Sequence, residues 1–192
     1  MKYLGVTISD NLTWSEHIRL TCKSAKRNVG LIRRQFNHAP PSVHHKIYKS
    51  VILPKLDCAM VWDPYFAADK SSLENVQKFT GKIITNQWNS SYSDIRNALN
   101  WQTLESHRKI IKLKVCYNIL NHYSCIPSSS FTPHPHPSPR LYPHNKTLFV
   151  PYARTLSHKS HFFFINVVPA WNSLPAYTVN STSPSPVLLP IL

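Results

Sequence analysis

The acidic residues, which a metal-dependent polymerase reaction would need, are few and scattered. Polymerases hold their metal ions with clustered carboxylates, because several oxygen ligands must converge on each ion. The chain has 192 residues and only eight acids, and no two of these form a D-D or D-x-D pair. Capping of helices and solvation are their expected roles, so the sequence predicts no two-metal catalytic site. The eight are Asp10, Glu16, Asp57, Asp63, Asp69, Glu74, Asp94 and Glu105.

Patterns for nucleophilic catalysis or metal binding are also missing from the sequence. No serine lies in a G-x-S-x-G turn, and three glycines in all exclude a glycine-rich phosphate loop. The four cysteines form no C-x-x-C pair and are typical of reduced intracellular thiols. The tract with His134, His136 and His144 could bind metal weakly, but a Pro/His tract without a site is the favoured interpretation. We expect no catalytic residue, metal site or cofactor in this chain.

Cationic side chains, in contrast, are abundant and gather on two predicted helices. There are 22 Lys+Arg against 8 Asp+Glu, a formal net charge of +14 and a pI near 9.8, which favours a polyanionic partner. The cations are expected on several faces of one helix, which suits contacts with phosphates rather than base edges. A solvated basic surface without a partner is the alternative. The candidates are Arg19, Lys23, Lys26, Arg27, Arg33 and Arg34 on the first helix and Lys109, Lys112 and Lys114 on the second.

Helices with apolar stripes must position these cations. An apolar stripe with spacings of three and four predicts a long helix over 15–38 that ends before Pro40, and it consists of Ile18, Cys22, Ala25, Val29, Ile32 and Phe36. Alternating β-branched residues predict one short strand over 2–9. Similar patterns predict helices from Ser42 with a kink or break at Pro54, and over 69–87, 93–99 and 103–122. The fold class is mainly α, a helical bundle preceded by a short β-strand.

Composition changes after Cys125. Twelve of the 16 prolines lie in 126–192, and no acid follows Glu105. We therefore expect a Pro/His/Ser-rich linker over 126–147 and an aromatic-rich C-terminal segment with a disordered tail over 148–192. No apolar run reaches the ~20 residues of a membrane span, and no signal peptide is recognisable. The expected location is intracellular, nuclear or cytoplasmic.

Several motifs in order resemble the C-terminal region of reverse transcriptases from non-LTR (LINE, jockey-like) retrotransposons. The first are K-Y-L-G-V-T-I at 2–8 and L-T-W-S-E-H-I at 12–18. They are followed by V-I-L-P-K-L-D-C-A-M-V-W-D-P at 51–64, L-E-N-V-Q-K-F at 73–79 and L-N-W-Q-T-L-E-S-H-R at 99–108. The last are R-T-L-S-H-K-S-H-F-F-F at 154–164 and P-A-W-N-S-L-P at 169–175.

This resemblance implies the part of such an enzyme that follows its catalytic centre. Residues 1–10 would be a residual palm strand, with Tyr3, Leu4, Gly5 and Val6 supporting the primer, and 11–125 a thumb-like domain. The family's catalytic F/Y-A-D-D motif and its endonuclease domain would lie upstream, and Mg²⁺ would belong to that missing palm. The implied partner is a template–primer duplex of RNA and DNA, without a membrane; the oligomeric state is unknown. By this interpretation the chain alone is not an enzyme.

Three functional hypotheses remain open from the sequence. The first is a nucleic-acid-binding module, and the second is a fragment of an active reverse transcriptase in a longer chain. The third is a remnant of a transposable element without selected function, or a structural or interaction fragment. The third predicts that a strand over 2–9 lacks sheet partners and exposes an unpaired edge.

Overall fold

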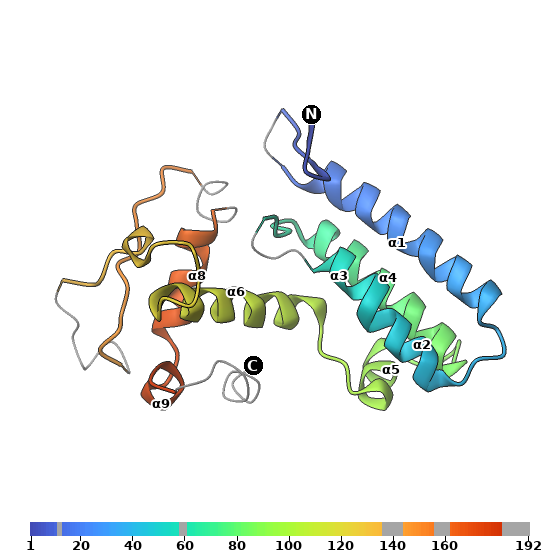
Figure 1. The fold of residues 1–192 in the computed structure, drawn as a ribbon. Coiled ribbons are helices and arrows are strands. Elements are labelled where there is room, and N and C mark those ends of the chain that lie inside the picture. Colours follow the sequence, from blue (N-terminus) through green and yellow to red (C-terminus); the bar gives the residue numbers. More distant parts are fainter. Residues whose placement is uncertain (11–12, 58–60, 136–143, 156–161, 182–192) are drawn as a thin grey trace. The chain divides into compact units, whose positions relative to one another are not determined.

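Helices dominate the residues that the computed structural model describes, which are 1–10, 13–57, 61–135, 144–155 and 162–181. The expected mainly α class with β structure at the N-terminus is confirmed (Figure 1). The chain forms two compact units, one of residues 1–58 and 62–107 and one of 59–61 and 108–192. Each unit has its own hydrophobic core.

A β-hairpin replaces the single strand expected over 2–9. Strands β1 (Lys2–Tyr3) and β2 (Val6–Thr7) pair antiparallel, with Lys2 opposite Thr7 and Tyr3 opposite Val6. Leu4 and Gly5 make the two-residue turn with φ of 46° and 85°. Positive φ at both positions matches the twist of a tight hairpin, and Gly5 adopts it without a steric penalty. The segment therefore satisfies much of its own backbone hydrogen bonding.

Helix α1 (Ser15–Gln35) is the first long element and packs on the core of unit 1 through its predicted stripe. Ile18, Cys22, Ala25 and Val29 are buried and Ile32 is half-buried, which confirms the periodicity, but Phe36 is 41% exposed and the prediction that it is buried was wrong. The Phe36 amide donates to the Ile32 carbonyl at the C-terminal end. The helix is slightly shorter than the predicted 15–38.

The next helical stretch is interrupted before Pro54, as expected. Helix α2 (Pro41–Ile47) continues into the π-helical turn η1 (Tyr48–Ile52) and then α3 (Leu53–Leu56). Proline has no amide hydrogen to donate to the preceding turn, and wider π turns accommodate such a loss. Tyr48 and Ile52 point into the core from this turn.

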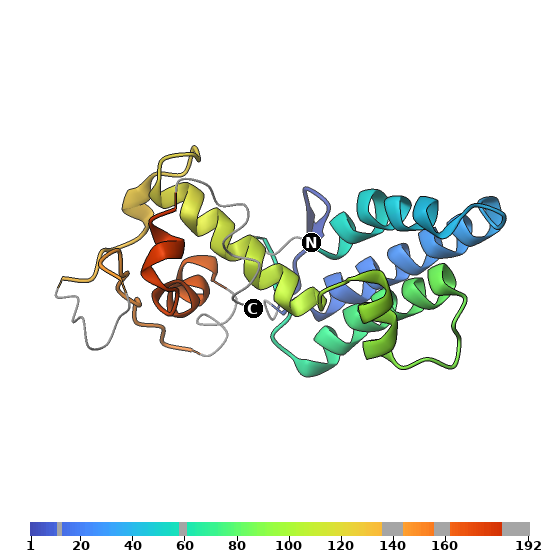
Figure 2. The ribbon, with the colours of Figure 1, turned by 90° about the horizontal axis from the view of Figure 1, so that it is seen from below.

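Helices α4 (Ala67–Thr85) and α5 (Tyr92–Leu99) complete the bundle of unit 1 (Figure 2). Asn86 and Asn100 end them in the left-handed conformation that favours Asn and Gly. Gly81 of α4 allows a close approach, because a Cβ there would lie 2.4 Å from Cγ2 of Ile95 on α5.

Trp62 and Trp101 are core residues of unit 1. Trp62 is 3% exposed, and Trp101 is 8% exposed and stacks on Tyr48 with ring centroids 4.1 Å apart. Ser91 caps α5 through a capping box with Asp94. Aromatic core residues and a helix cap thus stabilise the helical bundle of unit 1, to which α1 belongs.

Unit 2 is built on the greater part of α6 (Leu104–Leu120), which begins in unit 1. Thr103 caps the N-terminal end of α6, since the Ser106 amide donates to Thr103 Oγ1 at 3.1 Å. The short helices η2 (Ser128–Ser130) and α9 (Ala176–Val179) accompany α8 (Phe163–Asn172), whose Val167, Val168 and Trp171 enter the core.

The described parts of the expected linker belong to this folded unit. Phe131 is 4% exposed in the core, and Pro133 forms a β-bridge with Leu148. The Asn172 side chain binds both the amide and the carbonyl of Leu148, at 2.9 and 2.8 Å. A proline-rich segment can still be part of a folded unit, because a single buried aromatic side chain can attach an extended segment to the core. Residues 136–143 of this stretch, and the expected tail over 182–192, lie outside the described residues.

The observed division of the chain also differs from the expected one. A helical domain was predicted over 11–125, whereas the boundary between the units falls between His107 and Arg108, inside α6. A helix that continues across a boundary gives no break in its periodicity, so composition alone cannot mark it.

Candidate nucleic-acid interface

The six predicted cations of α1 lie on one stripe of the helix. At about 100° per residue they fall within an arc of about 120°, with Gly30 at its middle. The buried side chains lie on a different sector, centred on Ile18, Cys22 and Val29. The sequence interpretation had placed the cations on several faces, so the stripe is narrower than expected. It consists of Arg19, Lys23, Lys26, Arg27, Arg33 and Arg34 and is called the α1 stripe below.

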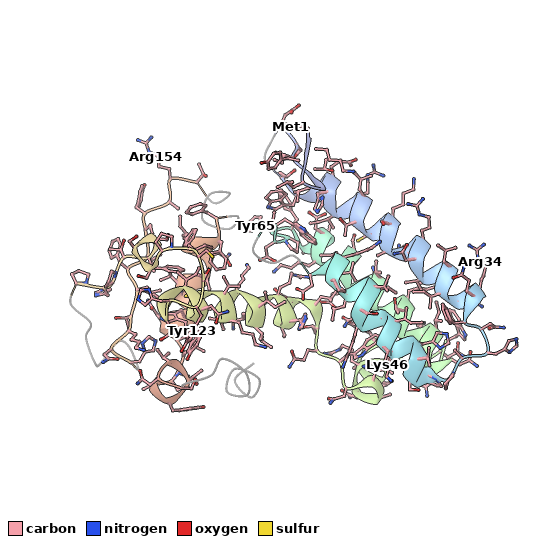
Figure 3. All side chains as sticks on the ribbon, in the orientation of Figure 1. Met1, Arg34, Lys46, Tyr65, Tyr123 and Arg154 are labelled. Carbon is pink, nitrogen blue, oxygen red and sulfur yellow. The ribbon has the colours of Figure 1, made fainter. Side chains whose placement is uncertain are left out.

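All six side chains of the α1 stripe are exposed. Figure 3 shows Arg34 at the end of α1 with its side chain directed away from the other helices of unit 1. Within the described ranges, Arg19 is the one stripe residue with an ion pair. Five cations are therefore available to an external anion without first breaking an ion pair in the described part of the chain.

Arg19 is held by Glu16, the only acid on α1. Its Nη2 and Nε donate to the Glu16 carboxylate at 2.7 and 2.8 Å. These hydrogen bonds lower the pKa of Glu16, which therefore stays ionised at neutral pH. The pair partly neutralises the N-terminal end of the stripe and leaves its C-terminal end strongly basic.

The length of the α1 stripe suits a nucleic-acid backbone. At 1.5 Å per residue, Arg19 and Arg34 are separated by about 22 Å along the axis. One strand of a duplex rises about 3.4 Å per nucleotide along the duplex axis and winds around that axis, so a straight helix of this length faces several of its phosphates. The six cations of the stripe can thus contact several neighbouring phosphates of a duplex backbone.

The α6 cations form a separate set in unit 2, and one of them is not where it was expected. Lys109 is exposed and Lys114 is half-buried. Lys112 was expected on the polar side of the helix but is 6% exposed, and its Nζ donates to Asn166 Oδ1 at 2.8 Å. Helix α8 covers this side of α6, which explains the burial. Lys112 is therefore not available as an exposed phosphate contact.

The hairpin with the predicted primer-supporting residues is attached to α1. Tyr3, Leu4 and Gly5 are exposed and Val6 is half-buried. The amide of Thr7 donates to Nδ1 of His17 at 3.2 Å. Burial lowers the pKa of His17, because the protonated ring would lose hydration. A neutral His17 is thus the acceptor that connects the hairpin to α1.

Trp88, a tryptophan that by residue type alone could stack on a base, lies near the stripe. It is 42% exposed, and the Arg33 guanidinium lies 5.3 Å from the centre of its ring. No periodicity marks it, since it follows α4 in a loop. The only signal in the sequence was its residue type, since a tryptophan ring can stack on a base.

The acids do not assemble into a metal site in the described part of the chain. No group of three or more His, Cys, Asp or Glu side chains there could hold a metal ion. Asp57 instead pairs with Nε2 of His107 at 2.8 Å, and Asp69 accepts from Ser15 Oγ at 2.7 Å. His144 lies 3.1 Å from the Trp171 carbonyl through its Nε2.

Comparison with known proteins gives no relative from which a function could be transferred. The chain matches no family model, no curated protein and no solved structure. Among the described helices, none is both long and apolar enough to cross a lipid bilayer.

Proposed function

We propose that this chain is a nucleic-acid-binding module that grips a template–primer duplex of RNA and DNA through the α1 stripe. Its place would be the thumb and post-thumb region of a non-LTR retrotransposon reverse transcriptase, with polymerase chemistry supplied by sequence outside this chain. The observation that carries the proposal is the stripe itself, six exposed cations on about 120° of one helix with one acid among them.

The charge density on the stripe favours a surface that binds a phosphate backbone over a solvated surface without a partner. Like charges three and four residues apart repel one another and destabilise a free helix. In a basic surface without a partner, nothing offsets this loss of helix stability. Solvated faces commonly mix both signs of charge. A polyanion removes the repulsion and releases its own counterions, so binding becomes favourable.

The core explains how the stripe stays in position. Ile18, Ala25 and Val29 are at most 2% exposed, which fixes the rotation of α1 about its axis. Rigid placement lowers the entropy lost when a ligand binds. The stripe therefore acts as a preformed track for phosphates and carries no sequence preference of its own.

The test is filter binding of the chain to an RNA–DNA duplex over a range of salt concentrations. Each phosphate contact contributes about −0.9 to the slope of log K against log salt for a B-form duplex. The double variant Lys23→Ala/Lys26→Ala should bind more weakly, with a slope shallower by about 2. Both side chains are exposed, so the fold should change in stability by no more than about 0.5 kcal/mol.

A matched control removes the same charge elsewhere in unit 1. Lys46 on α2 and Lys49 on η1 are also exposed, and Lys46→Ala/Lys49→Ala should leave the slope close to that of the parent chain. Equal losses in the two double variants would show that net charge, not the stripe, drives binding. No binding at low salt, or a flat response to salt, would reject the proposed function.

A further inference from the structure

An open hollow lies at the C-terminal end of the α1 stripe. It has a volume of about 780 Å³ and lies between α1 and α4. Three arginines provide its charge and one phenylalanine its apolar wall. The lining residues are Arg27, Gly30, Arg33, Arg34, Asn37 and Phe79.

Gly30 makes the hollow possible. A Cβ built at this position would meet no atom within 4 Å, so the space beside it is open. Gly30 is also at the middle of the stripe, where every neighbouring stripe residue is a long cation. The helix backbone thus forms part of the floor, and arginines stand around it.

An aromatic platform adjoins the hollow. Trp88 is 42% exposed, and Phe79 meets it edge to face with centroids 6.4 Å apart. Arg33, which lines the hollow, lies over the Trp88 ring. The loop is held in place, since Trp88 Nε1 donates to Asn86 Oδ1 at 3.3 Å and Lys82 Nζ donates to the Trp88 carbonyl.

We propose that this hollow binds one unpaired nucleotide of a nucleic-acid strand whose paired part lies along the α1 stripe. Arg27 and Arg34 would contact its phosphate, and its base would stack on Trp88 in place of, or together with, the Arg33 guanidinium. The inference rests on the proposed function, because the stripe supplies the strand that leads into the hollow.

The exposed indole of Trp88 favours an unpaired base over a base inside a duplex. The faces of bases inside a duplex are covered by their neighbours, so an exposed indole has nothing to stack on there except at an end or a bulge. Arginines beside an aromatic platform bind a phosphate and a base face at once, which is the pattern of single-strand sites. The module would therefore favour a duplex with a single-stranded overhang over a blunt duplex.

The experiment compares fluorescence anisotropy titrations with a blunt RNA–DNA duplex and with the same duplex carrying a short overhang. The parent chain should bind the overhang duplex more tightly. Trp88→Ala should weaken overhang binding by about 5- to 150-fold, the range for loss of one stacked base, and leave blunt-duplex binding unchanged. Trp88→Phe, which retains a ring, should keep part of the preference.

A second variant tests the hollow without touching charge or the platform. Gly30→Leu places a side chain in the open space, so it should abolish the overhang preference, measured as the ratio of the two affinities, whatever its effect on blunt-duplex binding at the middle of the stripe. Thermal melting of each variant confirms that the bundle is folded. Lys23→Ala serves as the contrast, since it should weaken both duplexes by the same factor.

The outcomes separate this inference from the function on which it rests. Absence of binding to either duplex would reject the phosphate track. Binding of both duplexes with equal affinity, or Trp88→Ala and Gly30→Leu variants that keep the preference, would reject the hollow alone. Quenching of indole fluorescence by a free nucleoside monophosphate, without an overhang preference, would assign the hollow to free nucleotides and overturn the strand assignment.

Discussion

Two glycines on long helices of unit 1 have opposite surroundings, which makes them a matched pair of residues. Gly30 on α1 faces open space, whereas Gly81 on α4 faces Ile95, Trp101 and Leu99. Neither has a positive φ, so each conformation suits alanine. The difference between the two positions is therefore one of packing alone.

Alanine at the two positions should shift stability in opposite directions. Gly30→Ala should stabilise the fold by up to about 1 kcal/mol through helix propensity. Gly81→Ala forces a Cβ to within 2.4 Å of Ile95 Cγ2, and overpacking of this kind costs about 1–3 kcal/mol, more than propensity returns. Urea denaturation of both variants measures the difference; stabilisation by Gly81→Ala would contradict the close approach of α4 and α5.

Charge at the start of the α1 stripe is set by one acid. Glu16 binds Arg19 through two hydrogen bonds and is exposed, so it competes with any phosphate for that guanidinium. We expect Glu16→Gln to tighten duplex binding by a few-fold and to steepen the salt slope by up to about 1, as one more cation becomes free. Isothermal titration at two salt concentrations measures both; weaker binding would mean that Glu16 positions Arg19 for the ligand.

At the scale of elements, the hairpin is attached to α1 by an acceptor that exists only in the neutral histidine. His17 Nδ1 accepts from the Thr7 amide, and burial lowers the pKa of His17 below its ordinary value of about 6.5. A pKa lower in the folded than in the unfolded state gives stability that is complete above about 6.5 and is lost as pH falls through the folded value.

Acidification should therefore release the hairpin before the bundle unfolds. We expect hydrogen exchange at the Thr7 amide to accelerate as pH falls below about 6.5, beyond the intrinsic pH dependence of exchange. His17→Asn is the control, since its side-chain oxygen can accept the same hydrogen bond and does not titrate. Identical pH profiles in both chains would show that His17 does not hold the hairpin.

Elements were predictable from the sequence where one buried face determines the pattern. The buried apolar side of α1 followed from residue spacing, and the interruption at Pro54 followed from proline chemistry. Both are observed. The hairpin was missed because its turn uses Leu4 at positive φ, where Asn or Asp is usual. Gly5 was the only signal of that turn.

The site could be predicted in part for a related reason. The α1 stripe is encoded in local spacing, so its members were identifiable from the sequence, although they were expected on several faces of the helix and not in one sector. Burial of Lys112 depends on α8, whose Asn166 comes 54 residues later in the chain. The position of Trp88 over Arg33 depends on how the loop after α4 folds back. Contacts between distant segments carry no local pattern.

At the scale of the whole molecule, the excess of positive charge has consequences apart from any single site. The net charge is +14, from 22 Lys+Arg against only 8 Asp+Glu, and one of the ion pairs seen among the described residues is made by a histidine, His107. Self-repulsion of this kind destabilises a compact state. It acts on both units and is greatest where cations are dense, as on α1.

Salt should therefore stabilise the free chain while it weakens the complex. Raising ionic strength from about 0.01 M to about 0.1 M shortens the Debye length from about 30 Å to about 10 Å, which screens repulsion across a helix. We expect the melting temperature of the free chain to rise over that range and the affinity for duplex to fall. Differential scanning calorimetry measures the first quantity and filter binding the second.

The stripe variant connects these two effects. Lys23→Ala/Lys26→Ala removes two repelling charges, so its melting temperature should depend less on salt than that of the parent, just as its binding does. Sucrose in place of salt controls for general effects of added solute, since it does not screen charge. If salt lowers the melting temperature of the free chain, repulsion on α1 is not a significant cost. Relief of repulsion would then no longer favour the binding of a phosphate backbone, and counterion release would be the only remaining driving force.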